Sequence, residues 1–193
     1  MSEFFLALVS AALINNLVLH QGLAIDPLLR SDTDPDRRQV HALGLATLVS
    51  LVVAVGLGQL IYHLALLPLQ LEYLRLFVFL ALCVLPIKPL LALLTRLLPT
   101  LPFDGLLPLM VGNLALLGLS LQASEGSYGI LQTLGWSLGG GLGFWLALGL
   151  FSDLRQRSDH DDIPLVFRGL PIELIGAGIM AMAFLGFNGL FNP

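Results

Sequence analysis

The sequence predicts an all-α integral membrane protein with six transmembrane helices, arranged as an inverted 3+3 repeat with both termini outside. Three observations predict it: a scarcity of charge, six long apolar runs and a one-sided distribution of basic residues. Of 193 residues only 9 are basic and 13 are acidic, while 56% are apolar. The charged fraction is 11%, against about 25% in an ordinary soluble domain. So few charges cannot cover the surface of a water-soluble globule.

Six apolar runs, free of formal charge apart from Lys88, are each long enough to cross a bilayer as a helix. A hydrocarbon core of roughly 30 Å needs about 20 helical residues. The runs do not alternate, which favours helices over barrel strands. No basic residue precedes the first run, and it is too long for the core of a signal peptide, so we expect it to remain as the first span. The predicted spans cover about residues 4–25, 43–67, 76–94, 105–123, 128–152 and 174–191.

The basic residues predict the orientation of these spans, because Lys and Arg concentrate in cytoplasmic loops. Eight of the nine fall on the side of the odd-numbered loops, and only Arg75 falls in an even-numbered loop. The odd loops are therefore expected in the cytoplasm. The two longest, about 26–39 and 153–169, are either solvated connections or a docking surface for a partner. The eight residues are Arg30, Arg37, Arg38, Lys88, Arg96, Arg155, Arg157 and Arg168.

A short sequence match supports two homologous halves. Six spans divide into two sets of three, and an odd number of spans per half places the halves in opposite orientations. Asn16 begins the tetrad NLVL in the first span, and Asn113 begins the tetrad NLAL in the fourth. Pro86 and Pro89 interrupt the third span, and further prolines precede the fourth. Transporters place their binding sites at broken helices of this kind.

Four polar side chains within the spans are the candidates for a polar path or for packing: Asn15, Asn16, Asn113 and Lys88. A buried amide in a helix bundle usually bonds to a neighbouring helix and contributes about 1 kcal/mol. The alternative is that paired asparagines line a path near the midplane. A lysine within a span is often functional. Lys88 nevertheless lies late enough in its span for its stem to reach the interface.

Composition and motifs argue against several functions. The net charge of −4 argues against nucleic-acid binding. Cys83 is the one cysteine, so the chain alone forms no disulfide, thiolate zinc site or iron–sulfur centre. Phosphate-binding loops, zinc spacings and nucleophile elbows are missing, so we predict no catalytic residue and no metal site on this chain. The glycines of the fifth span are interpreted as close helix contacts.

Five segments resemble the RnfA/NqrE type of membrane subunit, and the resemblance extends over almost the whole chain. They are 15–19 (NNLVL), 71–75 (LEYLR), 109–118 (LMVGNLALLG), 167–169 (FRG) and 177–190 (AGIMAMAFLGFNGL). The resemblance implies electron transport across a bacterial inner membrane coupled to ion transport. It implies as partners a sister six-span subunit of opposite topology and further subunits that carry flavin and iron–sulfur centres. The chain itself is then at most a non-autonomous subunit of a redox-driven translocase.

The chain departs from that family where the family holds half of an intramembrane [2Fe-2S] centre. Family members have a Cys-Pro pair after the first span and an Asn-Cys pair in the fourth, and the sister subunit supplies two further cysteines. Here the first position is Asp26, or Ala24 in a shifted alignment, and the second is Leu114. Leucine carries no ligand atom, so we predict no cofactor on this chain. The [2Fe-2S] centre and flavins are then expected in the complex or on partner subunits. An acidic residue of the family's third span is also replaced, by Leu91.

Two alternatives to a subunit of an Rnf-type complex stay open at this point. The missing cysteines and the proline-broken spans suggest a diverged paralogue that acts as a small inverted-repeat transporter or channel without a redox role. A structural membrane subunit that stabilises a partner is the second alternative.

Overall fold

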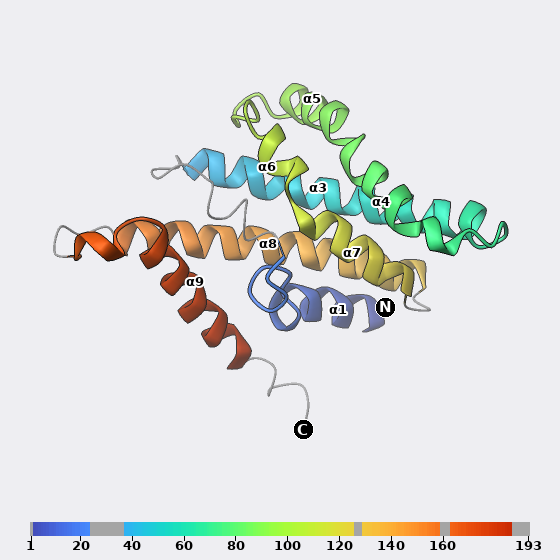
Figure 1. Ribbon diagram of the computed structural model, residues 1–193. Coiled ribbons are helices and arrows are strands. Elements are labelled where there is room, and N and C mark those ends of the chain that lie inside the picture. The colour runs from blue at the N-terminus through green and yellow to red at the C-terminus, as the bar shows by residue number, and fades with distance from the viewer. Residues whose placement is uncertain (1, 24–36, 126–128, 159–162, 187–193) are drawn as a thin grey trace.

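The computed structural model describes residues 2–23, 37–125, 129–158 and 163–186. Every regular element in these ranges is helical (Figure 1). The α-helices are α1 (Ser2–Val9), α3 (Arg37–Ile61), α4 (Arg75–Val84), α5 (Ile87–Leu97), α6 (Leu107–Val111), α7 (Leu114–Glu125), α8 (Ile130–Ser158) and α9 (Leu170–Leu185). Short helical turns are the π-helices η1 (Ser10–Ile14) and η2 (Tyr62–Leu66) and the 3-10 helices η3 (Glu72–Leu74) and η4 (Leu165–Phe167).

Four helical stretches of the described chain are long and apolar enough to cross a membrane. Two shorter apolar helices, Phe4–Ile14 and Leu170–Leu185, lie within the first and sixth predicted spans. Residues 24–25 and 187–191, which complete those two predicted spans, lie outside the described residues. The prediction of an all-helical membrane protein is therefore confirmed. The four long stretches match the second to fifth predicted spans: Arg37–Leu66, Glu72–Leu97, Leu107–Glu125 and Leu131–Ser158.

The first predicted span is helical only in its first half. α1 continues into η1, and the backbone over 15–23 then forms turns. The cause is Asn16, whose side-chain oxygen accepts hydrogen bonds from the backbone N–H groups of Val18 and Leu19, at 3.0 and 3.2 Å. In a continuing helix these groups would bond to carbonyls one turn earlier. An asparagine side chain that takes them instead ends the helix.

The third and fourth predicted spans are also interrupted. Leu85 and Pro86 separate α4 from α5, and Pro86 occupies the N-cap position of α5. This interruption follows from the proline, which lacks a backbone donor. Gly112 and Asn113 separate α6 from α7. The second interruption lies after the end of α6, whereas the nearest proline, Pro108, lies in the first turn of that helix.

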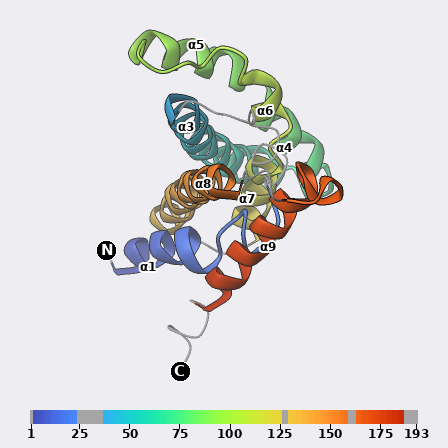
Figure 2. The ribbon, with the colours of Figure 1, turned by 90° about the vertical axis from the view of Figure 1, so that its left-hand side faces the viewer.

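The antiparallel pair α3 and α8 forms the centre of the bundle and shares the most extensive helix contact (Figure 1). α1 packs along α8, α7 packs on α3, and α4 packs on α7. Figure 2 shows α3 and α8 nearly end-on, with α4, α7 and α9 to their right and α1 below α8. The core between these helices contains large, fully buried side chains, among them Phe79, Phe144, Phe151, Leu43 and Leu51.

Glycines of α8 let neighbouring backbones approach closely, as predicted for the fifth span. A Cβ atom added to Gly135 would lie 2.8 Å from the carbonyl oxygen of Phe4 in α1. On another side of α8, a Cβ atom added to Gly141 would lie 2.7 Å from the Cα atom of Leu48 in α3. Real side chains do not fit at these separations. Glycine therefore sets the spacing of α8 from both neighbours.

Candidate functional site

Two buried asparagines, Asn16 and Asn113, each occupy an interruption of a helix. Their side chains are 0% and 3% exposed. Oδ1 of Asn113 accepts a hydrogen bond of 3.1 Å from the backbone N–H of Ala115, two residues further on. Oδ1 of Asn16 makes the same bond to Val18. Each asparagine therefore binds the backbone that follows it, and Asn113 in this way caps the start of α7. The two sequence tetrads thus share a local structure.

The amide nitrogens of these two asparagines have different surroundings. Nδ2 of Asn16 donates to the backbone carbonyls of Ala12 and Gly143, at 2.9 and 3.0 Å. Nδ2 of Asn113 is buried and has no hydrogen-bond partner among the described residues. A buried donor left without a partner costs about 1–3 kcal/mol. The side-chain amide of Asn16 thus has its hydrogen-bond partners within the chain, whereas Nδ2 of Asn113 retains an unpaired N–H donor.

Small polar side chains of α3, α4 and α7 lie buried between the helices, and apart from Cys83 the sequence did not indicate them. Thr47 Oγ1 lies 3.4 Å from the sulfur of Met110 in α6. Cys83 Sγ lies 3.9 Å from Ser120 Oγ. Ser50 Oγ is buried and lacks a partner in the part of the chain that the structure describes. Serine and threonine in apolar helices usually bond to their own backbone, so their sequence positions carry no clear signal.

Asn15 and Lys88 make no comparable contacts. Asn15 is half-buried and follows η1, and no side-chain hydrogen bond joins it to another described residue. Lys88 is exposed in the first turn of α5, directly after the interruption at Pro86. That its stem carries the charge out of the apolar layer stays a prediction. Of the four predicted residues, only Asn16 and Asn113 are both buried and located at an interruption between helical segments.

The fourth-span position of the family's cluster ligand does not fit a [2Fe-2S] centre in this chain. Leu114 is the first residue of α7 and is 61% exposed, and its side chain offers no donor atom. Cys83 contacts Ser120, well beyond Leu114 along α7. Within the described ranges no three His, Cys, Asp or Glu side chains gather as a metal site. Asp26 and Ala24 lie outside the described residues.

A buried ion pair joins α8 to α9 at one end of the bundle. Arg155 Nη2 lies 2.7 Å from Glu173 Oε2, and the two side chains are 8% and 9% exposed. The guanidinium also lies over the ring of Phe151, 5.5 Å from its centroid. The sequence placed Arg155 in a solvated or partner-binding connection. Neither interpretation holds for this residue, because α8 extends to Ser158 and the guanidinium is enclosed by its own chain.

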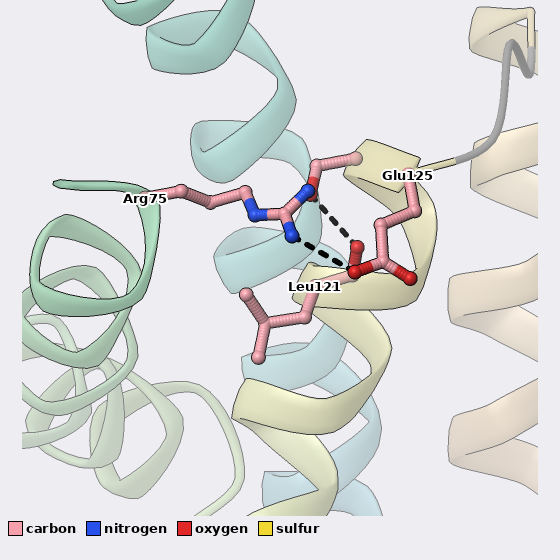
Figure 3. Close-up of polar contacts among 4 residues, drawn as sticks. Arg75, Leu121 and Glu125 are labelled. Atoms are coloured by element: carbon pink, nitrogen blue, oxygen red, sulfur yellow. Dashed lines mark hydrogen bonds and ion pairs between the residues drawn. The ribbon is translucent and has the colours of Figure 1, made fainter. Parts of the chain in front are cut away.

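An exposed ion pair lies at the opposite end of the bundle. Arg75, which begins α4, reaches Glu125 at the end of α7 with an N–O distance of 2.8 Å (Figure 3). The two side chains are 28% and 63% exposed. Close by, the side-chain amide of Gln59 donates to the carbonyl of Ala123. These contacts join the ends of α3, α4 and α7.

The described helices include four stretches that are long and apolar enough to cross a membrane. This architecture defines a multi-pass, all-helical membrane protein. The sequence profile of the family described as "Rnf-Nqr subunit, membrane protein" matches residues 4–191. The chain therefore belongs to the Rnf-Nqr family of membrane subunits, as its resemblance to RnfA/NqrE-type proteins implied.

Several similar proteins are named as the same subunit of an ion-translocating oxidoreductase complex. The protein of Pseudomonas aeruginosa is 38% identical over 198 residues, covering 100% of both chains. The protein of Syntrophotalea carbinolica is 37% identical over 195 residues, covering 98% of both. The protein of Aeromonas salmonicida is 33% identical over 194 residues, again covering 100% of both. The likeness thus extends over the full described architecture.

Proposed function

We propose that this protein is the RnfA-type membrane component of an Rnf-type, ion-translocating electron transport complex in the inner membrane of a bacterium. The observation that carries the proposal is the family match over residues 4–191, together with relatives that cover 98–100% of the chain. Its partners are a sister six-span membrane subunit together with redox subunits that carry flavin and iron–sulfur centres. The chain acts as a non-autonomous part of that complex.

Within this proposal the fold is an inverted 3+3 repeat of six spans with both termini outside. Gly44 of α3 packs against the ring of Trp145 in α8. Gly141 of α8 packs against Leu48 in α3. Gly141 follows Gly44 at the same sequence separation at which the NLAL tetrad follows the NLVL tetrad. Trp145 follows Leu48 at that separation too. Each of the two contacts therefore becomes the other when corresponding positions of α3 and α8 are exchanged. Two homologous halves related by a two-fold axis in the membrane plane would produce this pattern.

The proposal further states that this chain contributes no half-site to an intramembrane [2Fe-2S] centre. Support comes from Leu114, whose exposed side chain stands where the family has a cysteine. In a complex with a sister subunit, two thiolates from one side alone leave a cluster without half of its ligands. The function of this chain is then to hold the membrane helices of the complex in place, with the redox centres on its partners.

Purification of the tagged chain from cells that express its whole gene cluster tests the proposal. Copurification with flavin- and iron–sulfur-containing subunits supports it. A chain that always purifies alone, and that transports an ion or solute by itself, contradicts it in favour of a small transporter. The absence of a half-site is tested separately by electron paramagnetic resonance of the reduced complex. A [2Fe-2S] signal that changes in a Leu114→Ala variant would contradict that part alone.

A further inference from the structure

A groove of about 540 Å³ runs along the junction of α3 and α8. It lies on the side of α8 away from α7: Gly140 meets Leu119 of α7, whereas Leu142 and Gly149 project from the opposite side of the helix. Grooves of roughly 300–1,000 Å³ are the size that holds a small-molecule ligand.

The groove exists because the first helix stops early. η1 ends at Ile14, and Ala12 of this helix is the residue that meets Gly143 of α8. The part of α8 that lines the groove extends from Leu142 to Asp153, so most of it lies beyond Gly143, where Ala12 packs. The interruption at Asn16 therefore leaves this surface of α8 without a helical neighbour from that segment.

One wall of the groove is apolar and regular. Leu142, Leu146 and Leu150 follow one another at four-residue spacing, which places them on one side of α8. Their side chains are 40%, 41% and 44% exposed. Gly149 forms the floor beside them, and a Cβ atom added there would meet nothing within 4 Å. The wall is therefore an open apolar strip.

The end of the groove carries charges of both signs. Arg37, from the start of α3, and Asp153, from the end of α8, both line it and are both exposed. Neither has an ion-pair partner among the residues that the structure describes. His41 Nδ1 accepts a hydrogen bond of 3.1 Å from Trp145 Nε1. The proton of the neutral imidazole is then on Nε2, which leaves a donor at the mouth of the groove.

We propose that this groove binds one phospholipid whose head group contains a phosphate and a primary ammonium, of the phosphatidylethanolamine type. The phosphate lies at Arg37 and at the Nε2–H of His41, the ammonium lies at Asp153, and an acyl chain follows the leucine wall. Pockets with basic residues between membrane helices bind lipid head groups. A purely anionic head group would meet the unpaired carboxylate of Asp153, and a choline head group has no N–H to donate to it. A zwitterionic head group with a free ammonium is complementary to both Arg37 and Asp153, and this complementarity favours phosphatidylethanolamine.

Photolabelling of the intact complex tests the lipid site. Membranes that contain the complex receive a phosphatidylethanolamine with a photoreactive acyl chain, and the labelled peptides are mapped by mass spectrometry. Label is expected on the segment 142–153 of α8. The variant Gly149→Leu fills the groove, while Gly56→Leu is the matched control, because a Cβ atom there also meets nothing within 4 Å. Labelling is expected to fall about fivefold or more in Gly149→Leu. It is expected to fall by a similar factor in Arg37→Gln, because this variant removes one basic side chain at the membrane surface.

The head group is tested with matched photoreactive lipids. Wild-type protein prefers phosphatidylethanolamine to the phosphatidylglycerol and phosphatidylcholine probes, and Asp153→Asn abolishes the preference. Equal labelling by all three probes would overturn the head-group assignment. Unchanged labelling in Gly149→Leu, or crosslinks from segment 142–153 to a protein instead of a lipid, would overturn the site itself. The proposal needs only a membrane-embedded chain, so its failure leaves the proposed redox complex untouched.

Discussion

The side-chain amide of Asn16 donates a hydrogen bond of 3.0 Å to the backbone carbonyl of Gly143, 127 positions further along the chain. A Cβ atom on Gly143 would lie 2.9 Å from this amide nitrogen and 2.7 Å from the carbonyl oxygen of Ala12. The bond therefore requires glycine at this position. It fixes the end of the first helix to the middle of α8.

Replacement of Asn16 by leucine is expected to destabilise the protein strongly. Asn16→Leu leaves the N–H groups of Val18 and Leu19 without their partner, and it removes the side-chain bond to the carbonyl of Gly143, which as part of α8 also accepts a bond within its own helix. At about 1–3 kcal/mol for each buried N–H group left unpaired, we expect a loss of at least about 2 kcal/mol. Unfolding in mixed detergent micelles, followed by circular dichroism, measures it. The control Asn15→Leu is expected to stay within about 1 kcal/mol of wild type; equal losses would contradict the assigned role of Asn16.

Two glycine-to-alanine substitutions should have opposite effects. A Cβ atom on Gly139 would collide with the carbonyl oxygen of Leu8, and it would lie 2.9 Å from the Cβ atom of Ala11. Gly139→Ala is therefore expected to destabilise by about 1–3 kcal/mol. Gly56→Ala meets open space and should stabilise α3 by up to about 1 kcal/mol through helix propensity. The same unfolding assay compares them, and a neutral Gly139→Ala would show that α1 does not pack this closely.

The two ion pairs should differ in their contribution to stability. Arg155→Met leaves the carboxylate of Glu173 buried and unpaired, so we expect a loss of about 3–5 kcal/mol. Restoring apolar packing on both sides, in Arg155→Met/Glu173→Met, should recover much of that loss. Arg75→Met breaks a pair that is 28% and 63% exposed and should change stability by about 0–1 kcal/mol. A double-mutant cycle that finds no coupling between Arg155 and Glu173 would contradict the assignment.

Cysteines placed at the family positions should create a cluster in the assembled complex. Because the alignment allows two first positions, the variants are Asp26→Cys/Leu114→Cys and Ala24→Cys/Leu114→Cys. In one of them we expect more iron per complex than in wild type, together with a new [2Fe-2S] resonance, because a full thiolate set forms with the sister subunit. Leu114→Ser is the control and should show neither. Wild-type complex with the same iron content and signal would contradict the loss of the half-site.

Hydropathy and the scarcity of charge predicted the all-helical membrane architecture. Long apolar runs identified the helices now called α3, α4–α5, α6–α7 and α8, because the bilayer imposes a minimum length on any helix that crosses it. The glycines of α8 indicated close packing for an equally general reason, since association within lipid depends on close approach of backbones. Pro86 predicted the interruption between α4 and α5 through its missing donor.

Other features depended on contacts that no local pattern reveals. An asparagine in an apolar run either bonds across to a helix or ends its own helix, and Asn16 does both. The partner of Arg155 was missed because Glu173 lies just outside the predicted sixth span, and only the fold brings the two together. The unpaired amide of Asn113 was equally hidden, since the sequence shows a donor without showing what surrounds it.

The bond from Asn16 to Gly143 also has a consequence for biosynthesis. Ribosomes add about 5–20 residues per second, so Gly143 is made roughly 6–25 s after Asn16, given their separation of 127 positions. During that interval the first apolar segment has no carbonyl of α8 to bind. The amino-terminal segment is therefore synthesised first and completes its hydrogen bonds only after the fifth apolar run has left the ribosome.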